Sequence, residues 1–124
     1  MALLESGEMY LETILILSQR MPVVRAIDVC DELGYSKPSV SRAVHLLEDK
    51  GYIRIDTNGA ITLTESGSAI AERIYDRHQT LTSILVGLGI SEKTAAEDAC
   101  KMEHYLSEET YTAFKDHAKQ FGAK

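Results

Sequence analysis

Residues 25–63 have the sequence RAIDVCDELGYSKPSVSRAVHLLEDKGYIRIDTNGAITL, and this stretch decides the fold. Apolar residues at helical spacing predict a short helix over Arg25–Leu33, which Gly34 ends because glycine tolerates the left-handed backbone conformation. Ser36 is a favoured N-cap for a second helix, and Pro38 fits the first turn of that helix, where a missing N–H costs nothing. The stretch therefore begins with two helices joined by a tight turn.

A hairpin is predicted immediately after these helices. The second helix is expected to end at Lys50-Gly51, and apolar and polar residues then alternate on both sides of Asn58-Gly59, a strong hairpin-turn sequence. Two helices, a tight turn and a hairpin make the winged helix-turn-helix pattern. Helical periodicity predicts further helices over Leu3–Gln19, Thr64–Leu88, Glu92–Tyr105 and from Ser107 to about Phe121. We therefore expect a mainly α fold, with a winged helix-turn-helix DNA-binding domain over residues 1–63 and a helical domain over residues 64–124.

The beginning of the second helix has the residue types of a DNA-reading surface. Its small hydroxyl side chains allow close approach to DNA and hydrogen-bond phosphates or base edges. The ionised residues of 34–54 are net positive although the whole chain has a formal net charge of −6, and the distribution of charge matters more than its sum. An ordinary helical hairpin whose polar residues face water is the alternative. We expect DNA contacts from Ser36, Lys37, Pro38, Ser39, Ser41, Arg42, Arg54 and Asn58.

A second group of residues has the types and spacing of metal ligands. Cys100, Glu103 and His104 are at positions i, i+3 and i+4, so a continuous helix would place all three on one face. A thiolate, a carboxylate and an imidazole on one face supply three sides of a transition-metal site. Each of these residues alone is more often structural or solvent-exposed, so the hypothesis depends on the triplet.

Further donors are predicted on two other helices. Met9 and Glu12 are three residues apart in the first helix, and His78 is within the long helix, so up to six donors converge if these helices pack together. The sulfur atoms of Met9 and Cys100 favour Fe(II) or another softer divalent ion over Mn(II). Metal binding is then expected to lock the first helix against the helix that carries Cys100.

Composition and segment lengths exclude several classes of protein. Hydrophobic and charged contents of 44% and 26% are ordinary for a globular protein. The apolar run Ile14–Leu17 is far too short to cross a membrane, and no signal-peptide pattern is present. We therefore expect a cytoplasmic protein with no membrane partner and no organic cofactor. In that location we expect no disulfide, and we assign Cys30 to the core.

Five segments spread over nearly the whole chain form a combined pattern: EMYLETI at 8–14, SVS at 39–41, LTESG at 63–67, RH at 77–78 and DACKMEH at 98–104. Together they resemble the iron- and manganese-dependent repressors of the diphtheria toxin repressor family. The resemblance implies a metal-dependent transcriptional repressor, not an enzyme, that binds palindromic operator DNA as a homodimer. It also implies that the C-terminal helical domain binds metal and dimerises, with interface candidates Ile84, Leu85, Leu88, Ile90, Tyr105 and Leu106.

The same resemblance implies a mixed set of metal ligands. In iron-type members a Met, a Cys, a Glu and a His form the primary site, which here means Met9, Cys100, Glu103 and His104. Glu12 and His78 match ligands of the short manganese-type members, whose length this chain shares. The implied cofactor is therefore Fe(II) or Mn(II), with one or two divalent ions per chain.

The sequence departs from the family pattern at one site and leaves three competing functions open. The ancillary site of iron-type members is broken, because its positions here are Thr82 and Ala96. The main alternative is a metal-independent winged-helix regulator in which Cys100 is a redox-sensing thiol. A small metalloenzyme with Glu103 as a base, or a helical dimerisation module without DNA function, are the other two.

Overall fold

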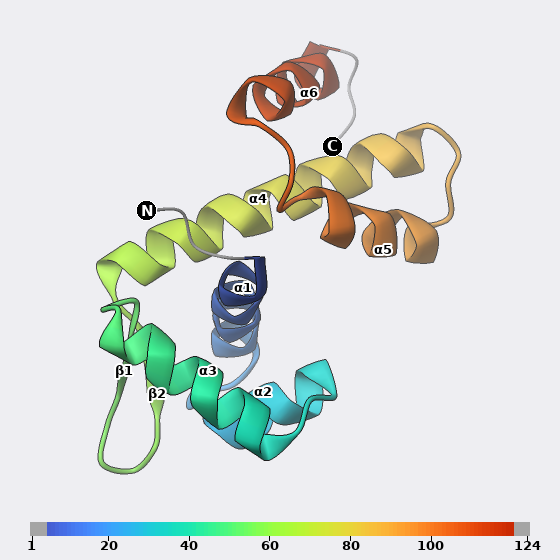
Figure 1. Ribbon diagram of the computed structural model, residues 1–124. Helices are drawn as coiled ribbons and strands as arrows, with labels where there is room; N and C mark the ends of the chain where they lie inside the picture. Colours follow the sequence, from blue (N-terminus) through green and yellow to red (C-terminus); the bar gives the residue numbers. More distant parts are fainter. Residues whose placement is uncertain (1–4, 121–124) are drawn as a thin grey trace. The chain divides into compact units, whose positions relative to one another are not determined.

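The computed structural model describes residues 5–120 and is mainly helical, as predicted (Figure 1). The expected first residue of the opening helix, Leu3, and the expected last residue of the final helix, Phe121, lie outside the described residues. In chain order the elements are α1 (Glu5–Arg20), α2 (Ala26–Leu33), α3 (Lys37–Asp49), β1 (Ile53–Ile55), β2 (Ile61–Leu63), α4 (Glu65–Gly87), α5 (Glu92–Met102) and α6 (Glu108–Gln120).

The chain divides into two compact units, an N-terminal unit up to Glu72 and a C-terminal unit from Arg73. The division falls inside α4, so this helix contributes its first two turns to one unit and the rest to the other. The functional boundary between residues 63 and 64 stays a prediction. No helix among residues 5–120 is long and apolar enough to span a membrane.

The N-terminal unit is a winged helix-turn-helix. Gly34 has φ 72° and ends α2, and the Ser36 hydroxyl accepts a hydrogen bond from the Ser39 amide at 3.3 Å, which caps α3. The wing pairs β1 with β2 in antiparallel register, Ile53 opposite Leu63. These three local predictions are confirmed. The core beneath them is apolar and consists mainly of Leu11, Ile14, Val29, Cys30, Val40, Val44, Ile53 and Ile61.

One backbone contact explains the glycine that follows the wing. The Thr64 hydroxyl donates to the Gly51 carbonyl at 2.7 Å and accepts from the Gly67 amide at 3.2 Å, so Thr64 caps α4, as predicted. A Cβ atom on Gly67 would lie 1.9 Å from the Tyr52 carbonyl oxygen. The start of α4 passes so close to Tyr52, which lies between α3 and β1, that only glycine fits at position 67.

The C-terminal unit contains the rest of α4 with α5 and α6. Asp76 on α4 accepts hydrogen bonds from the Tyr111 hydroxyl and, at 2.7 Å, from the Lys115 ammonium, which ties α6 to α4. The helix predicted over Glu92–Tyr105 ends earlier, at Met102, and Glu103 is its C-cap. The expectation that Cys100, Glu103 and His104 share one continuous helical face is therefore wrong for His104, which lies in the turn after the helix.

Candidate metal centre and DNA-binding surface

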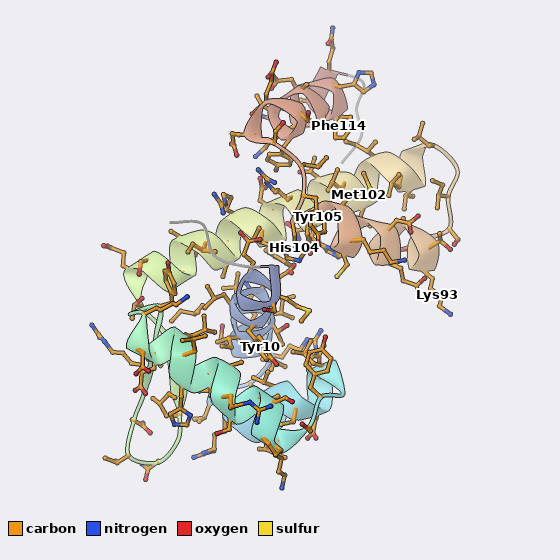
Figure 2. All side chains as sticks on the ribbon, in the orientation of Figure 1. Tyr10, Lys93, Met102, His104, Tyr105 and Phe114 are labelled. Carbon is orange, nitrogen blue, oxygen red and sulfur yellow. The ribbon has the colours of Figure 1, made fainter. Side chains whose placement is uncertain are left out.

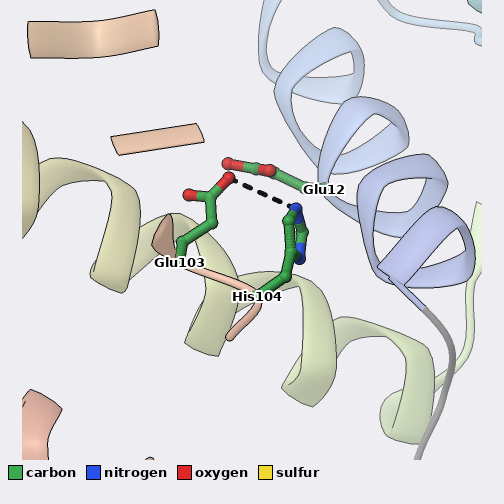
Figure 3. A group of neighbouring side chains, drawn as sticks. All are labelled: Glu12, Glu103 and His104. Carbon is green, nitrogen blue, oxygen red and sulfur yellow. Dashed lines mark ion pairs between the residues drawn. The ribbon is translucent and has the colours of Figure 1, made fainter. Parts of the chain in front are cut away.

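The C-terminal unit contains a buried carboxylate that has an imidazole near each of its two oxygens. Glu103 is 0% exposed. One of its oxygens is 3.2 Å from His78 Nδ1, and the other is 3.6 Å from His104 Nε2, the pair marked in Figure 3. Among the described residues, neither Glu103 oxygen accepts a hydrogen bond. Burial of a charged carboxylate is costly unless a cation or hydrogen-bond donors compensate it, so this site requires a positive charge.

Three different parts of the unit bring these side chains together. His78 lies in the middle of α4, Glu103 closes α5 and donates from its amide to the Ala99 carbonyl at 2.9 Å, and His104 is the next residue of the turn. The His104 side chain is 1% exposed, whereas the His78 side chain is 27% exposed. One carboxylate and two imidazoles therefore meet from elements that are 25 residues apart in the chain.

The donors and their spacing fit a divalent transition metal. Two ligands about 2.1 Å from one ion and about 100° apart are separated by about 3.2 Å. The separation of His78 Nδ1 from the Glu103 carboxylate is 3.2 Å, and that of His104 Nε2 is 3.6 Å. Imidazole and carboxylate are ligands shared by iron, manganese and zinc, so this donor set does not select among them. A protonated imidazole is the other cation that this carboxylate can pair with.

The remaining predicted ligands lie apart from this cluster or in the other unit. Cys100 is exposed on α5, and the structure does not bring its thiol together with Glu103 and His104. In the N-terminal unit, Met9 is half-buried on α1, and its sulfur lies 3.9 Å from the Tyr35 hydroxyl, which donates to it. Glu12, on the same helix, is 6% exposed and therefore is a buried carboxylate.

A second, partly exposed network in the C-terminal unit shifts three pKa values. Burial raises the pKa of Asp76, but the hydrogen bonds from Lys115 and Tyr111 outweigh burial and hold that pKa below 3.8. The hydrogen bond to Asp76 raises the pKa of Lys115, and burial, together with the same carboxylate, raises that of Tyr111. All three shifts favour the ion pair between α4 and α6.

The predicted DNA-contact residues lie at the surface of the N-terminal unit. Seven of the eight are exposed, and Ser39 is half-buried. Arg42 donates from Nη2 to the Ser39 hydroxyl at 3.5 Å, so the charged end of this side chain is held near the start of α3. Glu48 is one of the two acidic residues within 34–54, and it accepts a hydrogen bond from the Ile55 amide at 3.3 Å. The exposed charge of this surface is therefore mainly positive.

Sequence reasoning missed two residues that hold these sites. Arg25 donates from Nε to the Asn58 carbonyl at 3.1 Å, which links the start of α2 to the tip of the wing. Arg77 donates from Nη1 to the Glu103 carbonyl at 3.1 Å, beside the buried carboxylate. Both contacts join residues 26 or more positions apart, so no local pattern indicates them.

Comparison with known proteins gives two adjoining family matches. Residues 2–61 match the iron dependent repressor, N-terminal DNA binding domain, and residues 64–122 match the iron dependent repressor, metal binding and dimerisation domain. The transcriptional regulator MntR of Escherichia coli is 35% identical over 115 residues, 93% of this chain and 74% of that protein. The iron-dependent repressor IdeR of Mycobacterium tuberculosis is 31% identical over 108 residues, 86% of this chain and 47% of that protein.

Solved structures of similar fold include two metal regulators. The manganese regulator SloR superposes with a TM-score of 0.80 at 24% identity, over 95% of this chain and 54% of that one, and this likeness concerns the fold alone. The IdeR protein of T. acidophilum superposes with a TM-score of 0.81 at 25% identity, over 98% of this chain and 55% of that one. The chain thus spans about half the length of these two structures.

Proposed function

The chain belongs to the iron-dependent repressor family of metal-dependent transcriptional regulators, and from this premise we propose that a divalent ion at Glu103 controls its binding to operator DNA. The observation that carries the proposal is the fully buried Glu103 carboxylate, which faces two imidazoles and accepts no hydrogen bond within the described residues. A bound divalent cation supplies the positive charge that this carboxylate needs. Fe(II) and Mn(II) are the proposed effectors, with one or two ions per chain.

The proposed ligand set combines this cluster with residues from the sequence pattern. Glu103, His104 and His78 are proposed first, because the His78 and His104 imidazoles lie 3.2 and 3.6 Å from the two Glu103 oxygens. Met9, Glu12 and Cys100 remain proposed ligands on the strength of the family resemblance. The buried state of Glu12 is consistent with this role.

We propose that the C-terminal helices hold two copies of the chain together. Leu88 and Tyr105 are 73% and 74% exposed, and Phe114 is also exposed, which is unusual for such large apolar side chains. Figure 2 labels Tyr105 and Phe114. A twofold dimer presents two α3 helices and so suits a palindromic operator. In each copy the surface around Ser36, Lys37 and Arg42 would enter the major groove, with Arg54 and Asn58 of the wing at the neighbouring backbone.

Occupancy of the metal site and DNA binding should be coupled in both directions. If Glu103 and His104 hold the ion in the DNA-binding form, operator DNA must tighten metal binding by the same factor by which metal tightens DNA binding. Couplings of this kind are typically about 1–3 kcal/mol, or roughly 5- to 150-fold. We attribute the charge-dependent part of the coupling between metal binding and DNA binding to His78, Glu103 and His104.

The proposal is tested by titrating operator affinity with Fe(II), Mn(II) and Zn(II) under anaerobic conditions, on duplexes selected from a random pool by the metal-loaded protein. His104→Ala should abolish the metal response while the protein stays folded. His117→Ala is the matched control, because it removes an exposed imidazole from α6, and it should respond like the parent. A metal response that survives His104→Ala overturns the site. If a chelator does not weaken DNA binding, and DNA binding is lost only when Cys100 is oxidised, the redox alternative is supported instead.

A further inference from the structure

We infer that Arg77 is a positioning residue for the metal centre and that its guanidinium sets where the Glu103 carboxylate and the His104 imidazole point. This inference rests on the proposed function of the Glu103 site. Arg77 precedes His78 on α4, and it is 6% exposed, which is rare for an arginine and requires compensating contacts. All the contacts described below lie within the C-terminal unit.

The guanidinium closes the turn that leaves α5. Its Nη1 atom donates to two carbonyl oxygens, those of Glu103 at 3.1 Å and Leu106 at 2.8 Å. The last carbonyl groups of a helix have no partner within the helix, so a side chain that binds them fixes the path of the chain at that point. Glu103 and His104 both lie in the segment between α5 and Leu106, and they therefore take their orientation from this clamp.

Adjacent residues of α4 thus hold Glu103 from two sides. Arg77 binds its main-chain carbonyl, and His78 faces its carboxylate at 3.2 Å. Since both come from one rigid helix, a displacement of the turn relative to α4 changes the carbonyl contact and the ligand distance together. Residues that orient metal ligands without touching the ion typically change metal affinity by about 10- to 100-fold when replaced.

The same guanidinium connects the turn to α6. Its Nη2 atom pairs with Glu108 at 2.9 Å, and its Cζ atom lies 4.9 Å from the centre of the Tyr111 ring. The Glu108 side chain is 73% exposed, so this ion pair contributes little by itself. The two carbonyl contacts are therefore the part of the arrangement that positions the ligands.

The test compares metal affinity with stability in four variants of the full chain. Arg77→Met replaces the guanidinium with an unbranched apolar side chain and should weaken Mn(II) binding by about 10- to 100-fold. Mn(II) binding is measured by calorimetry without DNA. Arg77→Lys retains the charge but not the planar fork and should recover less than half of that loss on a logarithmic scale. Glu108→Gln should stay within about twofold of the parent, because it leaves both carbonyl contacts in place. Tyr111→Phe is the structural control: it removes the hydroxyl that binds Asp76 and lowers the melting temperature, with metal affinity unchanged.

A spectroscopic measurement separates positioning from general destabilisation. Co(II) bound to Arg77→Met at saturating concentration should have visible absorption bands of different position or intensity from those of the parent, whereas Tyr111→Phe should give the parent spectrum. The inference fails if Arg77→Met binds Mn(II) like the parent with the parent Co(II) spectrum, or if Tyr111→Phe weakens binding as much as Arg77→Met does. Failure of the parent to bind Mn(II) and Co(II) at all would instead refute the proposed function, so the two failures are distinguishable.

Discussion

Replacement of Glu103 by glutamine should separate the role of its charge in metal binding from its role in stability. In the metal-free protein, a protonated His78 that lies 3.2 Å from the carboxylate attracts it by roughly 5 kcal/mol at an effective dielectric constant of 20. Removal of a carboxylate from water costs several kcal/mol, so the two contributions nearly cancel. Glutamine has the same shape and no charge. We therefore expect Glu103→Gln to change the free energy of unfolding of the metal-free protein by less than about 1 kcal/mol.

The metal-loaded protein should respond very differently. A metal present at 100 times its dissociation constant stabilises the folded state by about 2.7 kcal/mol, which for a chain of this size raises the melting temperature by about 10 °C. A neutral amide cannot supply the negative charge that the ion requires, so most of this rise should disappear in Glu103→Gln. The combination of near-normal metal-free stability and a lost metal response is specific to a carboxylate that acts as a ligand.

The assay is thermal unfolding under anaerobic, reducing conditions, with chelator or with Mn(II) at matched concentrations. Glu97→Gln is the control, because it makes the same chemical change at an exposed position of the same helix and should keep the full metal-induced rise. A variant that retains the full rise would show that the ion binds elsewhere. A metal-free melting temperature lowered by an amount equivalent to more than about 3 kcal/mol would show that Glu103 forms a structural ion pair, and the reasoning above would be wrong.

Three further predictions follow from other parts of the structure. Gly67→Ala should lower the free energy of unfolding by about 3 kcal/mol or more, because the new Cβ would lie 1.9 Å from a backbone oxygen. Helix propensity alone predicts the opposite sign, a gain of about 1 kcal/mol. Urea titration decides between the two. The double change Lys37→Ala and Arg42→Ala should weaken operator binding and reduce the slope of log K against log salt by about 1.8, measured by fluorescence anisotropy; an unchanged slope would mean that neither side chain contacts phosphate. Asp76→Asn should destabilise the metal-free protein at pH 7. Because the pKa of Asp76 is lowered, its stabilisation is present above pH 3.8 and is lost as the pH falls through the lowered value. The stabilities of parent and variant should therefore converge in acid. A difference between them that does not change with pH would show that the ion pair is not its cause.

The N-terminal unit could be predicted because its signals are local. The cap at Ser36, the left-handed glycine at position 34 and the alternation around Asn58-Gly59 each depend on neighbours a few residues away, and all three appear in the structure. What the sequence did not reveal is the backbone bridge between Val24 and Ile61, where the Ile61 amide donates to the Val24 carbonyl at 2.7 Å. Such a bridge depends on how α1 and α2 pack, and no periodicity encodes that packing.

The metal site was only partly predictable, for a related reason. Residue types and spacing predicted Glu103, His104 and His78 as ligands, and the structure places both imidazoles near the Glu103 carboxylate. The helical periodicity over 92–105 contained no stop signal before Ser107, so the end of α5 at Met102 was not foreseen. A helix end that depends on a distant side chain, here the Arg77 guanidinium on the Glu103 carbonyl, leaves no trace in the local sequence.

Cys100 and Glu103 are three positions apart in the chain but have different surroundings. On a continuous helix Cys100 and Glu103 would share one face, yet the thiol is exposed and the carboxylate is 0% exposed. Glu103 is the C-cap, so its carbonyl turns to Arg77 and the residues after it leave the helical path. An ion held by Glu103, His104 and His78 does not require Cys100. If Cys100→Ser weakens Mn(II) binding as strongly as His104→Ala does, the thiol is a ligand and its surroundings must differ in the metal-bound protein.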